Sequence, residues 1–136
     1  MIDHISIAVS DLAASAALYE RVLEPLGLVQ LVRRDGTVGF GKRYPEFWLN
    51  SRPGLPPAPK DNGTHMCLRA PDEAAVRAFF TAALAGGCTG DGDPGPRQAA
   101  MTGYFAAFIR DRDGNRIEAA TFPARGASWT TPTPAP

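Results

Sequence analysis

The chain has 136 residues and balances 14 Lys and Arg against 14 Asp and Glu, so its formal net charge at pH 7 is zero. A neutral chain has no overall field to collect nucleic acid or an anionic membrane, and no apolar run reaches the roughly 18–20 residues of a membrane-spanning helix. The length is sufficient for one compact domain with its own core, and the partner expected is a small molecule rather than nucleic acid or a membrane.

The cysteine content bears on the compartment. Cys67 and Cys88 are the only two cysteines, too few for a disulfide framework. Residues 1–5 lack the basic region and following apolar stretch of a secretory signal. We therefore expect two reduced thiols and a cytoplasmic protein.

The first half of the chain predicts one strand, one helix and three short strands. Residues 4–9 alternate apolar with small or polar side chains, which is typical of a strand with one face against a core. Asp11 is a good N-cap for the helix that follows, Pro25 should perturb its last turn, and Gly27 ends it. The three strands are expected at about 28–33, 37–41 and 46–50.

The second half follows a connector, the Pro-rich segment 51–63. Residues 65–70 alternate as 4–9 do, and Asp72 caps a second helix that ends at a pair of glycines. The remaining pattern predicts a weak strand near 88–91, a Gly/Pro loop at 92–98, strands at about 103–110 and 115–122, and an Asp-Gly-Asn hairpin turn at 113–115. We expect the charged residues at 110–113 to be solvated.

The two halves are copies of one unit. Residues 4–19, HISIAVSDLAASAALY, align without a gap with 65–80, HMCLRAPDEAAVRAFF, so that His4 meets His65 and Asp11 meets Asp72. This predicts an α+β fold of two tandem βαβββ modules whose curved mixed sheets surround a cleft. The predicted organisation is one domain over 1–123, with module 1 at about 1–50, the connector at 51–63, module 2 at about 64–123, and a flexible Pro/Thr tail at 124–136.

Three stretches carry a family resemblance, namely DHISIAVSDLAASAALYERVLEPLGL at 3–28, GTHMCLRAPDEAAVRAFF at 63–80 and YFAAFIRDRDGNRIEAATF at 104–122. They resemble the vicinal oxygen chelate superfamily, which includes glyoxalase I, bleomycin-resistance proteins and extradiol dioxygenases. The resemblance covers nearly the whole chain except the tail. It implies paired βαβββ modules around a cleft, with metal ligands on the first and last strand of each module.

Carried onto this sequence, the resemblance implies His4, His65 and Glu118 as metal ligands. The last-strand position of the first half is Trp48, and Glu46 lies two residues away on the same face. The two histidines are the only ones in the chain, and their equivalent positions in the repeat make coincidence a poor explanation. The alternative is that each is a histidine hydrogen-bonded at a sheet edge. Two imidazoles and one carboxylate suit a divalent Fe, Mn, Ni, Co or Zn ion and leave positions for substrate oxygens.

Four further residues are candidates for substrate binding. Trp48 faces the cleft by register, and Tyr104 is a candidate proton donor. Arg69 and Arg116 share strand faces with the expected ligands and would meet an anionic substrate. Core packing is the alternative for Trp48 and surface or core placement for Tyr104, while solvated or paired side chains are the alternative for the arginines.

Two functions remain open from the sequence. The first is a metal-dependent small-molecule enzyme, a lyase, isomerase or dioxygenase, whose divalent ion chelates adjacent oxygens of the substrate. The second is a metal-free protein that sequesters a planar or cationic ligand, as bleomycin-resistance proteins do, and Trp48 in place of a ligand favours it. The sequence also leaves open whether the protein is a homodimer with modules paired across subunits.

Overall fold

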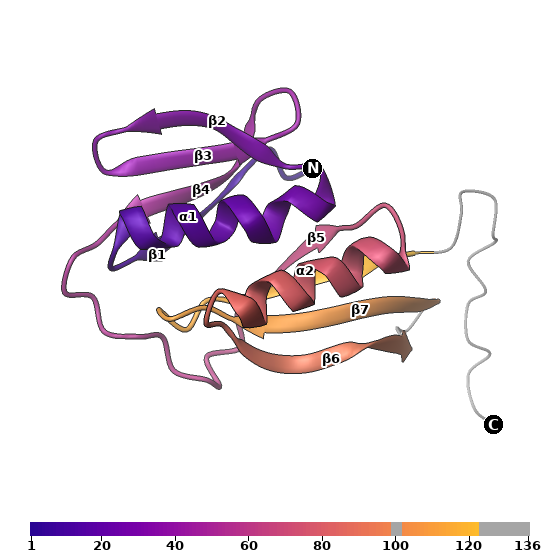
Figure 1. The fold of residues 1–136 in the computed structure, drawn as a ribbon. Helices are drawn as coiled ribbons and strands as arrows, with labels where there is room; N and C mark the ends of the chain where they lie inside the picture. The colour runs from indigo at the N-terminus through magenta and orange to yellow at the C-terminus, as the bar shows by residue number, and fades with distance from the viewer. Residues whose placement is uncertain (99–101, 123–136) are drawn as a thin grey trace.

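Each half of the chain forms one β-α-β-β-β module in the computed structural model, which describes residues 1–98 and 102–122 (Figure 1). The first module consists of β1 (Ile5–Val9), α1 (Leu12–Leu23), the 3-10 turn η1 (Glu24–Leu26), β2 (Val29–Arg34), β3 (Thr37–Gly41) and β4 (Pro45–Ser51). The second consists of β5 (Met66–Arg69), α2 (Glu73–Ala85), β6 (Thr89–Gln98), β7 (Gly103–Arg110) and β8 (Arg116–Thr121).

The two modules have the same sheet topology. The strand order is β1-β4-β3-β2 in the first sheet and β5-β8-β7-β6 in the second. In each sheet the first and last strands of the module pair in parallel, while the other pairs are antiparallel. Neither of these mixed sheets is closed within the described residues. The predicted α+β fold with two βαβββ modules is therefore confirmed.

Local capping chemistry explains where the helices begin. The Asp11 carboxylate accepts a hydrogen bond of 3.0 Å from the backbone N–H of Ala14, and Asp72 accepts one of 2.8 Å from Ala75. Pro25 lies in η1, where the regular helix has already ended, and Gly27 follows with a φ of 80°. Both predicted caps and the perturbed last turn are confirmed.

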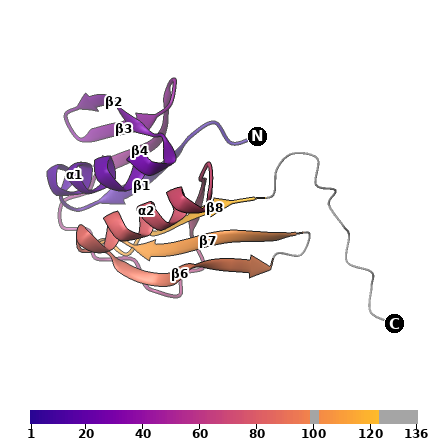
Figure 2. The same ribbon diagram turned by 45° about the vertical axis from the view of Figure 1, so that its right-hand side comes forward.

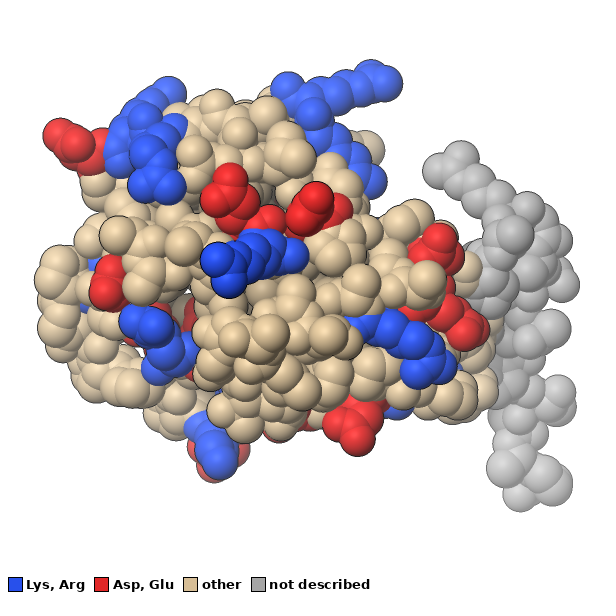
Figure 3. Space-filling model, viewed as in Figure 1, with Lys and Arg blue, Asp and Glu red and all other residues tan. Residues whose placement is uncertain are grey.

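The helices form one layer. Figures 1 and 2 show α1 over the first sheet and α2 over the second, with the two helices side by side. Alternate residues of the strands other than the edge strands β2 and β6 pack against this layer, and Tyr19 and Phe79 of the helices are fully buried. The opposite face of each sheet, here called its open face, carries both polar and aromatic side chains. Figure 3 shows acidic and basic side chains interspersed over the helical side, in keeping with zero net charge.

The region around β6 differs from the sequence prediction. The prediction of a Gly/Pro loop at 92–98 is wrong, since β6 runs from Thr89 to Gln98. This strand lies at the edge of its sheet and pairs only with β7. Its outer side forms no ladder of hydrogen bonds, so prolines, which lack a backbone N–H, are tolerated there. Register shifts between Gly90 and Gly92, and between Gly92 and Gly95, absorb the irregular spacing.

The turn between β7 and β8 is a second correction. The charged residues at 110–113 were expected in solvent, but Asp111 and Asp113 are buried where the modules meet. Tyr19 Oη donates to Asp111 Oδ2 at 2.8 Å, the Asn115 amide donates to the Ala8 carbonyl at 2.9 Å, and the Ser10 N–H donates to Asp113 Oδ1 at 3.1 Å. These bonds join the turn to the first module. The buried carboxylates of Asp111 and Asp113 are therefore stabilised by hydrogen bonds within the protein rather than by water.

Three smaller points complete the fold. The first strand begins at Ile5, so His4 lies just before it rather than inside it. Both cysteines are free. The tail predicted at 124–136 lies outside the described residues, and none of the helices in 1–98 and 102–122 is long and apolar enough to cross a bilayer.

Candidate functional site

The open face of the second sheet brings together two of the three expected ligands. His65 precedes β5, and Glu118 lies in β8, the strand paired with β5. His65 Nε2 is 3.0 Å from Glu118 Oε2. The Glu118 side chain is only 4% exposed, against 40% for His65, and Glu118 Oε1 is buried without a hydrogen-bond partner among the described residues. A buried carboxylate oxygen without a donor is energetically costly unless another group satisfies it.

Two protonated groups surround the Glu118 carboxylate. Cys67 is its direct neighbour in the strand register, and burial followed by the Glu118 charge raises the pKa of the thiol to about 12. Burial and then Glu118 also raise the pKa of Tyr104 above its usual value. Both groups therefore keep their protons at neutral pH, so neither adds negative charge beside Glu118.

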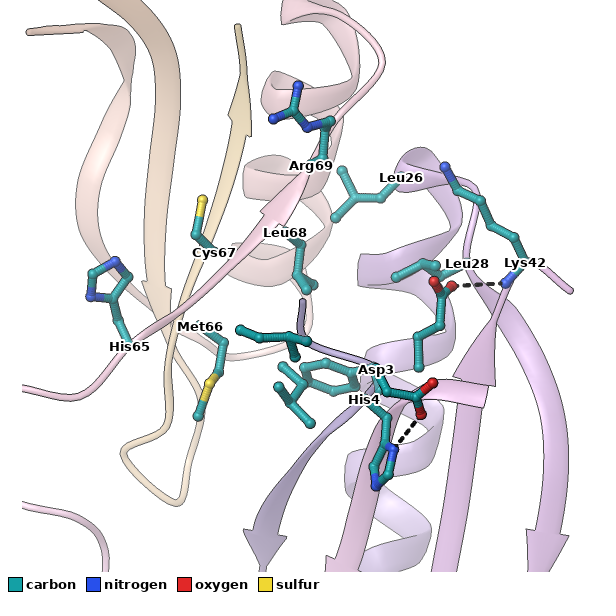
Figure 4. Close-up of a pocket in the computed structure, with 14 residues that line it drawn as sticks. Asp3, His4, Leu26, Leu28, Lys42, His65, Met66, Cys67, Leu68 and Arg69 are labelled. Atoms are coloured by element: carbon teal, nitrogen blue, oxygen red, sulfur yellow. Dashed lines mark hydrogen bonds and ion pairs between the residues drawn. The ribbon is translucent and has the colours of Figure 1, made fainter. Parts of the chain in front are cut away.

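The third expected ligand lies apart from this pair. His4 is held beside Asp3, with His4 Nδ1 2.7 Å from Asp3 Oδ1. His4 and His65 line opposite sides of a groove of about 410 Å³ between the two modules (Figure 4). Glu118 is not among the described residues that line the groove. No group of three or more His, Cys, Asp or Glu side chains that could hold a metal occurs in 1–98 and 102–122.

Phe108 also contacts this pair, although it is not among the candidate residues named from the sequence. It stands opposite Glu118 in the register of β7 and β8. Its ring meets the His65 ring edge-on, with 5.6 Å between centroids and 61° between planes. The Arg116 guanidinium carbon lies 4.1 Å from the centre of the same ring. The signal was available, because Phe108 falls on the same alternating face as Tyr104.

The two candidate arginines both stack on aromatic rings of the open face. Arg69 lies over Phe122, with 4.7 Å from the guanidinium carbon to the ring centre. Phe122 in turn stacks on Tyr104, with 5.1 Å between centroids. Arg116 stacks on Phe108, as described above, and its Nε is 2.5 Å from Asp91 Oδ2. Both arginines and Tyr104 therefore lie on the side of the sheet that carries His65.

Strand register decides which residue of the first module corresponds to Glu118. Glu118 pairs with Cys67, and the equivalent of Cys67 in the repeat is Ser6, which pairs with Trp48. Trp48 therefore occupies the position of Glu118, and Glu46 does not. The indole lies close over β3, since a Cβ added to Gly39 would be 2.9 Å from its ring.

Comparison with protein-family models matches residues 1–119 to the Glyoxalase/Bleomycin resistance protein/Dioxygenase superfamily. The chain belongs to this superfamily. A search of curated proteins gave no significant match.

Solved structures agree with the membership. A glyoxalase/bleomycin resistance protein from Albidiferax ferrireducens is 29% identical, with 88% of this chain and 98% of that chain covered and a TM-score of 0.77. A glyoxalase-related enzyme from Fulvimarina pelagi is 16% identical, with 99% of both chains covered and a TM-score of 0.68. A glyoxalase/dioxygenase from Nostoc punctiforme is 20% identical, with 91% and 92% covered and a TM-score of 0.66. The last two likenesses concern the fold alone.

Proposed function

We propose that this member of the superfamily is a metal-dependent enzyme acting on a small molecule with two adjacent oxygens, and that His65 and Glu118 are metal ligands. The observation that carries the proposal is the Glu118 carboxylate, which is buried, lies 3.0 Å from His65 Nε2 through one oxygen, and has no hydrogen-bond partner at the other among the described residues. An imidazole and a carboxylate fit a divalent transition metal, and a cation would satisfy the unpartnered oxygen. When bound, such an ion supplies Lewis-acid polarisation of substrate oxygens.

His4 is proposed as the third ligand, supplied by a second copy of the chain. Within one chain His4 belongs to the first module and bonds to Asp3, while His65 and Glu118 belong to the second. A homodimer that pairs the first module of one copy with the second module of the other would bring the three side chains together. Sedimentation of the protein with and without added metal tests for that dimer.

Side chains around the proposed ligands have roles of their own. Phe108 packs against the His65 ring and restrains its orientation. Tyr104, whose pKa is raised by burial and by Glu118, holds its proton at Oη and is proposed to donate it to the substrate. These roles require only the residues of the second module.

Metal titration of protein purified without a histidine tag tests the proposal. We expect the chain to bind about one equivalent of Mn(II), Fe(II), Ni(II), Co(II) or Zn(II) by isothermal titration calorimetry. We expect His65→Ala and Glu118→Gln each to weaken binding by at least about tenfold, because each removes a ligand. Thermal melting should show that the variants stay folded. Far less than stoichiometric metal, with no uptake of any added ion, would contradict the proposal.

The His4→Ala variant tests whether the proposed metal site has two protein ligands or three. If His4 completes the site, this variant also binds metal at least about tenfold more weakly, and the loss accompanies loss of the dimer. Unchanged metal affinity in His4→Ala would leave His65 and Glu118 as ligands and remove His4 from the set.

A second candidate function is metal-free sequestration of a planar ligand. The specific observation in its favour is that Trp48 holds the register position of Glu118, so the first module offers an indole where a second carboxylate ligand would stand. Sequestration predicts that a planar ligand binds equally well in the presence of a chelator and that Trp48→Ala abolishes binding.

A further inference from the structure

One arginine beside the His65–Glu118 pair is held in a fixed position with its terminal nitrogens unused. Arg116 stacks on Phe108, the ring that also contacts His65, and its Nε bonds to Asp91 Oδ2 at 2.5 Å. In the described part of the chain no hydrogen bond involves its two terminal nitrogens. Its side chain is 29% exposed, so a ligand can reach it. A guanidinium that the protein has already oriented loses little entropy when it binds a planar anion.

A neighbouring arginine shows how different this arrangement is. Arg110 also bonds to Asp91 Oδ2, at 3.1 Å, but its terminal nitrogens donate to the carbonyls of Gly114 and Lys60. All three nitrogens of the Arg110 guanidinium therefore bond to other parts of the protein. Asp91 is shared by two guanidinium groups, so this group of three side chains carries one net positive charge.

A second guanidinium lies on the other side of Glu118. Arg69 pairs in register with Ala120, two residues beyond Glu118 in β8, whereas Arg116 is two residues before it. Two residues in a strand span about 7 Å, so the arginine positions bracket the buried carboxylate along the sheet. Arg69 has a ring contact with Phe122 and no ion pair within the described residues. In the described part of the chain, the open face therefore has a cationic group on either side of Glu118, whose Oε1 is buried without a hydrogen-bond partner.

We propose that the substrate is a small carboxylic acid, whose carboxylate binds the terminal nitrogens of Arg116 and whose adjacent oxygens reach toward His65 and Glu118. The inference rests on the proposed function for the reaction, and it names the substrate class of that same site. A planar carboxylate matches the planar fork of a guanidinium. Arg69 adds long-range attraction and is the weaker contributor.

Binding of carboxylate probes to the metal-free protein tests the proposal. Benzoate and succinate are titrated into ¹⁵N-labelled protein in the presence of a chelator, with benzamide, succinamide and inorganic phosphate as matched probes. We expect the two acids to shift resonances of β7 and β8 with saturation, and the amides to bind at least about tenfold more weakly, because they carry no charge for the guanidinium. Equal binding of acid and amide, or tighter binding of phosphate, would overturn the proposal.

Matched arginine variants locate the site. We expect Arg116→Gln to weaken benzoate binding by at least about tenfold, and Arg69→Gln by a smaller factor. Arg77→Gln is the control, because Arg77 also stacks on an aromatic ring, Phe105, but Phe105 belongs to the core cluster under α2. Unchanged affinity in Arg116→Gln, or an equal loss in Arg77→Gln, contradicts the assignment.

A structural role for Arg116 is distinguished in the same experiment. Arg116→Lys keeps the positive charge but not the fork, so we expect intermediate affinity and a preserved preference for acid over amide. If Arg116 served only to hold β8, its variants would lower the melting temperature and leave the acid-to-amide ratio unchanged. Acid binding without metal uptake would overturn the metal proposal alone, and metal uptake without acid preference would overturn this one alone.

Discussion

At the scale of single residues, Glu118 influences its surroundings through charge. It is buried, it pairs with His65, and its charge contributes to the raised pKa of Cys67. The effect on Cys67 can be measured directly, because only a thiolate reacts rapidly with alkylating reagents.

Glu118→Gln should make Cys67 more reactive. Removing the negative charge lowers the pKa of the thiol from about 12, although burial, the largest cause, keeps it above the ordinary value of 9.0. We expect alkylation of Cys67 by iodoacetamide at pH 8 to accelerate several-fold, measured by mass spectrometry in a chelating buffer. Cys88 is the internal control, since burial followed by Asp111 raises its pKa to about 11 and Glu118 is not among the causes. An unchanged rate at Cys67 would contradict the electrostatic coupling.

At the scale of elements, the packing of β3 against β4 fixes an aromatic side chain on the open face. Trp48 lies over Gly39, where a Cβ would be 2.9 Å from both the indole and Pro45. The glycine is therefore required by the close approach of a side chain, and its φ is not in the left-handed region.

Gly39→Ala should displace Trp48 and destabilise the first sheet. Overpacking of this kind costs about 1–3 kcal/mol, and we expect that loss in urea unfolding together with a shift in tryptophan emission in a Trp129→Phe background. Gly103→Ala in the second sheet is the matched control, because among the described residues its Cβ would meet nothing closer than 3.6 Å. Equal stability of Gly39→Ala and the parent protein would show that the indole moves without cost.

At the scale of the whole molecule, a buried polar turn couples the two modules. Tyr19 of the first module donates to Asp111 of the second, and both groups have raised pKa values. For Tyr19 the largest cause is burial, followed by the negative charge of Asp111. The folded protein therefore holds the phenolic proton at a pH where the unfolded chain has lost it.

Tyr19→Phe should change how stability depends on alkaline pH. Above the ordinary value of 10.0 unfolding releases the Tyr19 proton, so the wild type loses stability as pH rises and the variant lacks that contribution. At pH 8 we expect the variant to be about 1–3 kcal/mol less stable in urea, since Asp111 loses a donor. The difference should narrow at pH 11. Tyr44→Phe, which alters an exposed tyrosine, is the control, and a difference that stays constant or widens would contradict the prediction.

The sequence by itself determined the duplicated order of elements, both helix caps and the face on which each strand residue lies. These features are local, because an aspartate caps the turn that follows it and alternation assigns faces one strand at a time. The family resemblance added His65 and Glu118 as candidate ligands from the first and last strands of the second module. The same local rules did not predict β6. Its Gly and Pro residues are unfavourable in a central strand, but an edge strand tolerates them.

The tertiary structure alone decided which of these side chains meet. His65 Nε2 lies 3.0 Å from Glu118 because β5 pairs in parallel with β8, whereas His4 precedes a strand of the other sheet and bonds to Asp3. The buried environment of Asp111 likewise depends on Tyr19, 92 residues away in the chain. Spacing along a chain cannot specify such contacts, since they depend on how two sheets and a shared helical layer pack together.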